Sequence, residues 1–146
     1  MKRFFSALVV VSLMAALHTS CESLEGADNE ENQFFIGLWE GVDPLDGSGV
    51  QVSISDLDRD GEFDIIWRET FFALCDGERG IVTGTGTVGE DGILRTNEVF
   101  TCLPTGEPSD GEAIYEPVKK DEILIASSPT SPDLPPIILH QVSSRM

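Results

Sequence analysis

The chain has 146 residues, enough for one domain around one hydrophobic core. It carries 26 acidic side chains against 9 basic ones, a formal net charge of −17 at pH 7. A charge of this sign repels nucleic acid and anionic lipid headgroups, so we expect neither as a partner.

Residues 1–20 have the pattern of a secretory signal peptide. Lys2 and Arg3 form a positive start, and residues 4–17 are almost purely apolar. That run is too short to span a bilayer comfortably, but it suits the apolar core of an export signal. A buried N-terminal helix or strand is the alternative. Cleavage would leave 7 basic against 26 acidic side chains, a net charge near −19.

The segment Leu17-His18-Thr19-Ser20-Cys21 resembles the lipobox of bacterial lipoproteins. In that family a small residue precedes a cysteine that is lipidated and becomes the new N-terminus. Thr19 and Ser20 match this pattern, whereas His18 stands where an aliphatic residue is usual, which leaves ordinary signal cleavage open. The resemblance implies an exported protein of the bacterial cell envelope, attached to a membrane through lipid on Cys21.

Residues 21–33 are acidic and almost free of large apolar side chains, which predicts a disordered tether. From residue 34 onward, short runs of β-branched and aromatic residues alternate with Gly, Asp, Asn and Pro, which is typical of strands. The predicted strands lie, by residue number, at 34–40, 50–55, 63–74, 81–88, 93–102, 113–116, 122–127 and 136–142.

Eight short strands joined mostly by tight loops indicate one all-β domain, residues 34–146, folded as a single antiparallel meander. We expect this meander to close, or nearly close, into a small barrel, because closure removes exposed sheet edges; an open sandwich is the alternative. Inward side chains can fill so small a barrel, so little room for a ligand is expected.

The segment Gly37-Leu38-Trp39 resembles the Gly-x-Trp on the first strand of the calycins, the lipocalin-like and avidin-like barrels. The resemblance implies that Gly37 and Trp39 form a plug at one end of the barrel, with Arg145 as a counterpart of the arginine that packs on this ring in lipocalins. A plain core tryptophan is the alternative. Small disulfide-bearing barrels also include bacterial periplasmic inhibitors of proteases and lysozymes, a similarity of architecture that does not fix function.

Residues 56–64 form a loop with acidic side chains at alternate positions. They resemble the first nine positions of an EF-hand calcium loop, with Gly61 after the third acidic residue. The pattern predicts a calcium site with an affinity on the order of 10⁻⁴–10⁻³ M. Trp67 stands at the twelfth position, where an EF-hand has glutamate, so a solvated acidic hairpin turn is the alternative. The candidate ligands are Asp56, Asp58, Asp60, Glu62 and Asp64.

The three cysteines are an odd number for an exported chain. Lipid on Cys21 would leave Cys75 and Cys102 as a pair able to form a disulfide in an oxidising compartment. Free buried thiols are the alternative. In a meander these two cysteines emerge at the same end, opposite the acidic loop.

Enzyme motifs are weak. Once a signal is removed, His140 is the only histidine, which gives no basis for a Ser-His-Asp or zinc site. The glycine-rich residues 84–86 lack the helix that a phosphate-binding loop needs. Carboxylates are abundant, and no catalytic pair stands out. Trp67, Phe71 and Phe72 are expected to form the core and one rim, or to line a pocket.

We therefore expect a non-catalytic exported lipoprotein, a small barrel that binds a protein or a small apolar ligand. An inhibitor of a protease or lysozyme is the first alternative, and a hydrolase using carboxylates is the second.

Overall fold

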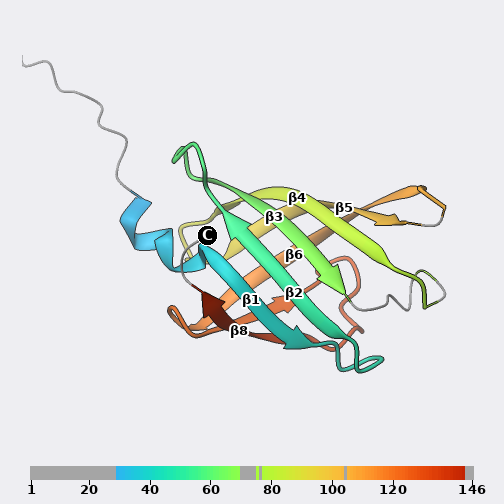
Figure 1. The fold of residues 1–146 in the computed structure, drawn as a ribbon. Coiled ribbons are helices and arrows are strands. Elements are labelled where there is room, and N and C mark those ends of the chain that lie inside the picture. Colours follow the sequence, from blue (N-terminus) through green and yellow to red (C-terminus); the bar gives the residue numbers. More distant parts are fainter. Residues whose placement is uncertain (1–28, 70–74, 76, 104, 144–146) are drawn as a thin grey trace, which may run out of the picture.

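The computed structural model describes residues 29–69, 75, 77–103 and 105–143 (Figure 1). Within them, eight antiparallel strands form one closed barrel in sequence order. β1 pairs with both β2 and β8, which closes the sheet. The predicted closed meander is confirmed and the open sandwich is wrong. The elements are the 3-10 helix η1 (Asn29–Phe35), β1 (Gly37–Val42), β2 (Gly49–Ser55), β3 (Glu62–Glu69), β4 (Gly80–Val88), β5 (Leu94–Cys102), β6 (Pro108–Lys119), β7 (Ile123–Ser127) and β8 (Ile137–Ser143).

Two predicted elements differ from the structure. β6 is longer than the predicted strand 113–116, because residues with little strand propensity pair with β5 as far as Thr101↔Pro108. The first predicted strand, 34–40, is divided: Phe34 and Phe35 belong to η1, and β1 begins at Gly37. In both cases contacts made in the folded barrel, rather than local propensity, decide the boundary.

Helix η1 covers one end of the barrel, where β1 begins and β8 ends (Figure 1). Residues 29–33, expected to be part of the disordered tether, are helical instead. The physical reason is the anchor that follows them: Phe35 is fully buried, and its ring meets that of Phe63 edge-on at 6.0 Å. Lys120 lies over the ring of Phe34, 5.0 Å from its centroid, and ties η1 to the turn between β6 and β7.

Trp39 is fully buried close to this covered end. Its indole Nε1 donates a hydrogen bond of 2.8 Å to the carbonyl oxygen of Phe35. Gly37 lies where β1 and β8 approach closely, since a Cβ atom there would be 2.2 Å from the carbonyl oxygen of Ser143. Trp39, Phe35 and η1 together seal this end. Arg145 lies outside the described residues, as do Phe71 and Phe72.

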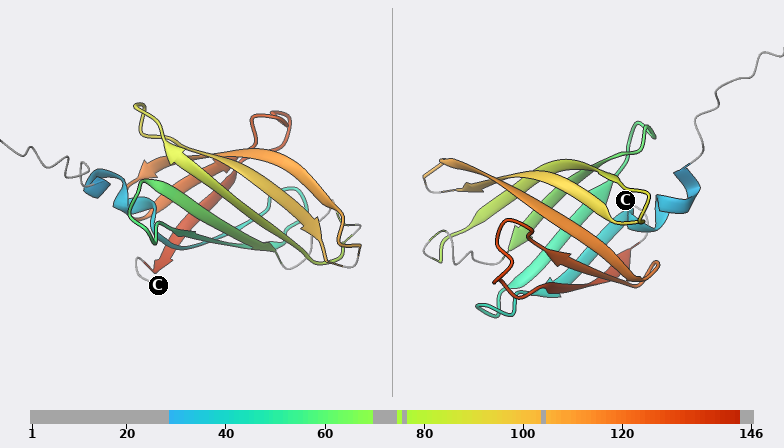
Figure 2. Two further views of the ribbon diagram at one scale, coloured as in Figure 1. Left: turned by 90° about the horizontal axis from the view of Figure 1, so that it is seen from above. Right: turned by 180° about the vertical axis from the view of Figure 1, so that it is seen from behind.

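Figure 2 shows from two further sides how the strands wrap around a common interior. Alternate residues of the strands face this interior and form the core. β3 shows the pattern clearly, because its buried residues alternate with exposed ones. β4 carries glycines at inward positions; a Cβ atom at Gly84 would lie 2.4 Å from the carbonyl oxygen of Asn97. Besides Phe35 and Ser48, the fully or almost fully buried side chains are Trp39, Val52, Ile54, Phe63, Ile65, Leu94, Tyr115, Leu124 and Leu139.

The Cys75–Cys102 disulfide is present, with its Cα atoms 5.6 Å apart. It joins the loop after β3 to the end of β5, at the end of the barrel opposite η1. The loop from Asp56 to Gly61 lies between β2 and β3 at the covered end. The predicted separation of disulfide and acidic loop is therefore confirmed.

Among the residues described, no helix is long and apolar enough to cross a membrane. The predicted signal peptide and the lipidation site Cys21 lie outside the described residues.

Candidate functional site

A cavity of about 370 Å³ opens at the uncovered end of the barrel. The expectation that inward side chains leave little room is wrong, because small residues such as Gly111, Ala113 and Ala126 occupy inward positions near this mouth. Its apolar wall comes from six strands, β3 to β8, together with the loop before β8 and the loop between β1 and β2. The apolar lining residues are Leu45, Trp67, Val82, Phe100, Ala113, Ala126, Leu134, Pro135 and Ile137.

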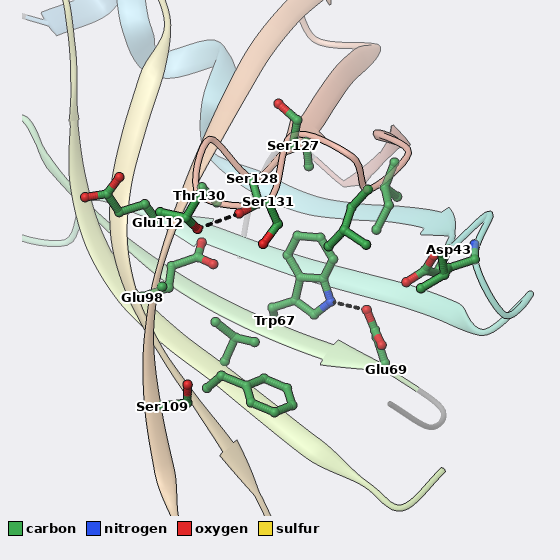
Figure 3. A pocket seen from close by; sticks show the side chains of 18 of the residues that line it. Asp43, Trp67, Glu69, Glu98, Ser109, Glu112, Ser127, Ser128, Thr130 and Ser131 are labelled. Carbon is green, nitrogen blue, oxygen red and sulfur yellow. Dashed lines mark hydrogen bonds between the residues drawn. The ribbon is translucent and has the colours of Figure 1, made fainter. Parts of the chain in front are cut away.

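Trp67 lies at the centre of the cavity wall, with Glu98 on one side and Glu69 on the other (Figure 3). Its indole Nε1 donates a hydrogen bond of 2.9 Å to Glu69 Oε1. Burial raises the pKa of Glu69 from 4.5 to about 7, against the lowering effect of this hydrogen bond, and the carboxylates of Asp43 and Asp46 add to the rise. Glu69 therefore changes its charge close to neutral pH.

Glu98 lies deeper in the barrel than Trp67. Cross-strand pairing puts it opposite Gly84, one inward position beyond the pair Val82↔Phe100. The absence of a side chain at Gly84 makes room for Glu98, since a Cβ atom there would be 2.9 Å from Glu98 Cγ. β4 and β5 thus hold a carboxyl group inside the barrel, where a hydrophobic residue would ordinarily lie.

Two hydroxyl groups position the Glu98 carboxyl. The Tyr115 hydroxyl donates to Glu98 Oε1 at 2.8 Å, and Thr96 Oγ1 donates to the same oxygen at 2.9 Å. Burial raises the pKa of Glu98, and these two hydrogen bonds lower it by a smaller amount. Burial and the neighbouring Glu98 both raise the pKa of Tyr115, so its hydroxyl stays protonated and remains a donor.

The charged side chains that line the cavity in the described part of the chain are all acidic. Among the described residues that line it, none is Lys, Arg or His. Hydroxyl groups of the loop before β8 add a polar edge, where Ser128 and Thr130 hydrogen-bond to each other at 3.0 Å. The five acidic lining residues are Asp43, Glu69, Glu98, Asp110 and Glu112.

The predicted calcium ligands lie at the other end of the molecule. Asp56 is buried, its Oδ2 accepts the amide of Gly61 at 3.3 Å, and its Oδ1 has no hydrogen-bond partner. Asp58 and Asp60 are exposed on the turn. In the part of the chain that the structure describes, no three acidic, His or Cys side chains converge as a metal site requires. The orphaned oxygen of Asp56 suits a cation, and calcium binding here stays a prediction.

Glu69 and Glu98 were missed as site residues by the sequence analysis. Each was nevertheless detectable, because each lies in phase with buried neighbours: Glu69 follows Phe63, Ile65 and Trp67 at intervals of two, and Glu98 follows Leu94 and Thr96 in the same way. A carboxylate in the inward phase of a barrel strand indicates a buried polar site. Trp67, predicted to line either the core or a pocket, lines the cavity.

His140 points outward on β8 and is exposed, away from the cavity. The fold and site together define an eight-stranded up-and-down barrel with one end sealed and one end open to an acidic, mainly apolar cavity. Comparisons with protein-family models, with curated proteins and with solved structures found no match to this chain.

Proposed function

We propose that this protein is a non-catalytic binding barrel of the bacterial cell envelope, which holds a small, mainly apolar ligand in the cavity beside Trp67. The observation that carries the proposal is the cavity itself, of about 370 Å³. Small-molecule sites are usually apolar concavities of about 300–1,000 Å³ with a few fixed polar groups.

The two ends of the barrel support a binding role. η1, Phe35 and Trp39 cover one end, so among the described residues a ligand enters at the end that carries the disulfide. Trp67 offers a large aromatic face on the wall, and such faces supply much of the contact energy of small ligands. A site that is deep, apolar and closed at its base retains a ligand better than an open groove.

A matched pair of substitutions tests this proposal. Val82 lines the cavity and is 7% exposed, whereas Val99 faces outward on the adjacent strand and is 39% exposed. Binding is measured with the probe N-phenyl-1-naphthylamine, which is uncharged at neutral pH and whose fluorescence increases in apolar sites. Val82→Phe should weaken probe binding about tenfold or more, since each methylene group denied burial costs about 0.8 kcal/mol. Val99→Phe should bind as wild type does. Equal binding by both variants, or no saturable binding by wild type, would contradict the proposal.

Attachment to the membrane through Cys21 belongs to the same proposal and has its own test. The intact mass of protein extracted from membranes should correspond to a chain that begins at a lipidated Cys21. A chain with an unmodified Cys21, or one that keeps residues 1–20, would contradict this part.

A second candidate function is hydrolysis by carboxyl groups. Glu69 and Glu98 line one cavity, and burial raises the pKa of both, as is usual for catalytic acids. Hydrolysis of a polysaccharide substrate that is lost in both Glu69→Gln and Glu98→Gln, but kept in Glu116→Gln on the outer face of β6, would favour this function over simple binding.

A further inference from the structure

Glu98 is a half-buried carboxyl group that faces the cavity, and no described residue of the cavity wall is basic. Burying a carboxylate is costly unless a positive charge or several hydrogen bonds compensate it. The hydrogen bonds from Tyr115 and Thr96 both use Oε1, so only one of the two carboxyl oxygens is satisfied by protein. Figure 3 shows the Glu98 side chain pointing into the cavity on the side of Trp67.

The surroundings of the cavity favour a positive charge as the missing partner. Asp43, Asp110 and Glu112 lie among the lining residues together with Glu69, and no described lining residue is basic. Carboxylates around a cleft with apolar walls raise the local concentration of cations and speed their association. The Trp67 indole adds an aromatic face, to which a cation is attracted within about 6 Å of the ring centre.

We infer that the natural ligand is a small organic ammonium ion with an apolar body, bound with its N–H groups at Glu98 and its hydrocarbon part against Trp67, Val82 and Phe100. The inference rests on the proposed function and names its ligand class. The ammonium group supplies the hydrogen-bond donors that the open Glu98 oxygen lacks. The apolar body covers the wall between Glu98 and the mouth. Glu69 and the hydroxyl groups of the loop before β8 form the polar rim of the site.

The chemistry also sets what the site rejects. The charged side chains that an apolar carboxylate or phosphate would meet in the described lining are all acidic, so its own charge would be desolvated without a positive partner. An alcohol of the same length keeps the apolar contacts but offers a single neutral donor. We therefore expect the order ammonium, then alcohol, then carboxylate.

Three ligands with the same chain test the inference: octylammonium, 1-octanol and octanoate, each used to displace N-phenyl-1-naphthylamine from the purified protein at pH 7.5. Octylammonium should bind about 10- to 100-fold more tightly than 1-octanol, the range expected for a hydrogen-bonded charge pair. Octanoate should bind most weakly.

Glu98→Gln removes the charge but keeps an oxygen that can accept from Tyr115 and Thr96. It should lower the affinity for octylammonium about tenfold or more, while the affinity for 1-octanol stays within about twofold. Glu116→Gln is the matched control, because Glu116 is exposed on the outer face of β6 and should leave all three affinities unchanged. If Glu98→Gln does not fold, the ratio of ammonium to alcohol binding in wild type decides alone.

The outcomes separate this inference from the proposed function. If 1-octanol binds at least as tightly as octylammonium, or if the preference survives Glu98→Gln, the inference is overturned and the apolar binding function stands. If neither the probe nor any of the three ligands binds, both are overturned.

Discussion

The pH dependence of stability provides a sharp test of the cavity geometry, through Glu69. Burial raises the pKa of this carboxyl from 4.5 to about 7 in the folded chain. Between these values the folded state holds a proton that the unfolded state has lost, so stability falls as the pH rises from about 4.5 to about 7. The stabilising effect of the proton is complete below 4.5 and absent above 7.

The size of this loss of stability follows from the difference between the folded and unfolded pKa values of Glu69. For a fully buried carboxyl, the free energy of unfolding would change by ~3 kcal/mol, because each unit of pKa difference corresponds to 1.36 kcal/mol. Because Glu69 lies near the mouth and is partly exposed, solvent screening reduces this to ~1–2 kcal/mol. Between pH 5 and pH 8, the free energy of unfolding of wild type should fall by ~1–2 kcal/mol more than that of Glu69→Gln, as measured by denaturant unfolding. The glutamine keeps an acceptor for the Trp67 indole. Glu116→Gln controls for the loss of one surface charge. Parallel curves for wild type and Glu69→Gln would refute the buried environment assigned to this carboxyl.

Three further predictions concern the rest of the fold. Calcium at ten times a millimolar dissociation constant should stabilise wild type by ~1.4 kcal/mol and raise its Tm by a few degrees. Asp58→Ala should show no such rise. An unchanged Tm in wild type would show that the acidic loop is a plain turn. The disulfide closes a loop with a sequence separation of 27, so the double variant Cys75→Ser, Cys102→Ser should lose ~3–4 kcal/mol in denaturant unfolding; a loss below about 1 kcal/mol would contradict the chain-entropy argument. Gly84→Ala should cost ~1–3 kcal/mol because its Cβ would lie 2.4 Å from Asn97 O, whereas Thr83→Ala on the outer face should change stability by less than ~0.5 kcal/mol; equal effects would argue against the close approach.

Local sequence patterns were sufficient for the strands and their order. Alternation of apolar and polar residues places both bounds of β2 and the start of β3 within one residue, and a meander then needs only short loops between neighbours. The same reasoning puts Cys75 and Cys102 at one end, where the disulfide is found. Local propensity was misleading at the N-terminal side of β1. Phe34 and Phe35 have strand propensity, yet they belong to η1 because the end of the barrel offers their rings a buried site.

The cavity could not be predicted because it depends on register and on volume. The sequence shows glycine at position 84 and a carboxylate at position 98, but only cross-strand pairing brings them opposite each other. In the same way, Ala113 and Ala126 read as ordinary small strand residues until both face one interior. The most conspicuous acidic pattern, residues 56–64, lies at the sealed end. The inward-facing carboxyl groups of Glu69 and Glu98 lie toward the open end.

Methyl-resolved NMR with octylammonium tests the central claim most directly, because it locates the ligand in the barrel. Val82 and Ile137 line the cavity, whereas Ile138 and Val142 are exposed on the outside of β8. The account predicts saturable shifts of the Val82 and Ile137 methyl signals, with those of Ile138 and Val142 unmoved. Shifts confined to the outer residues, or the absence of any saturable shift, would contradict it.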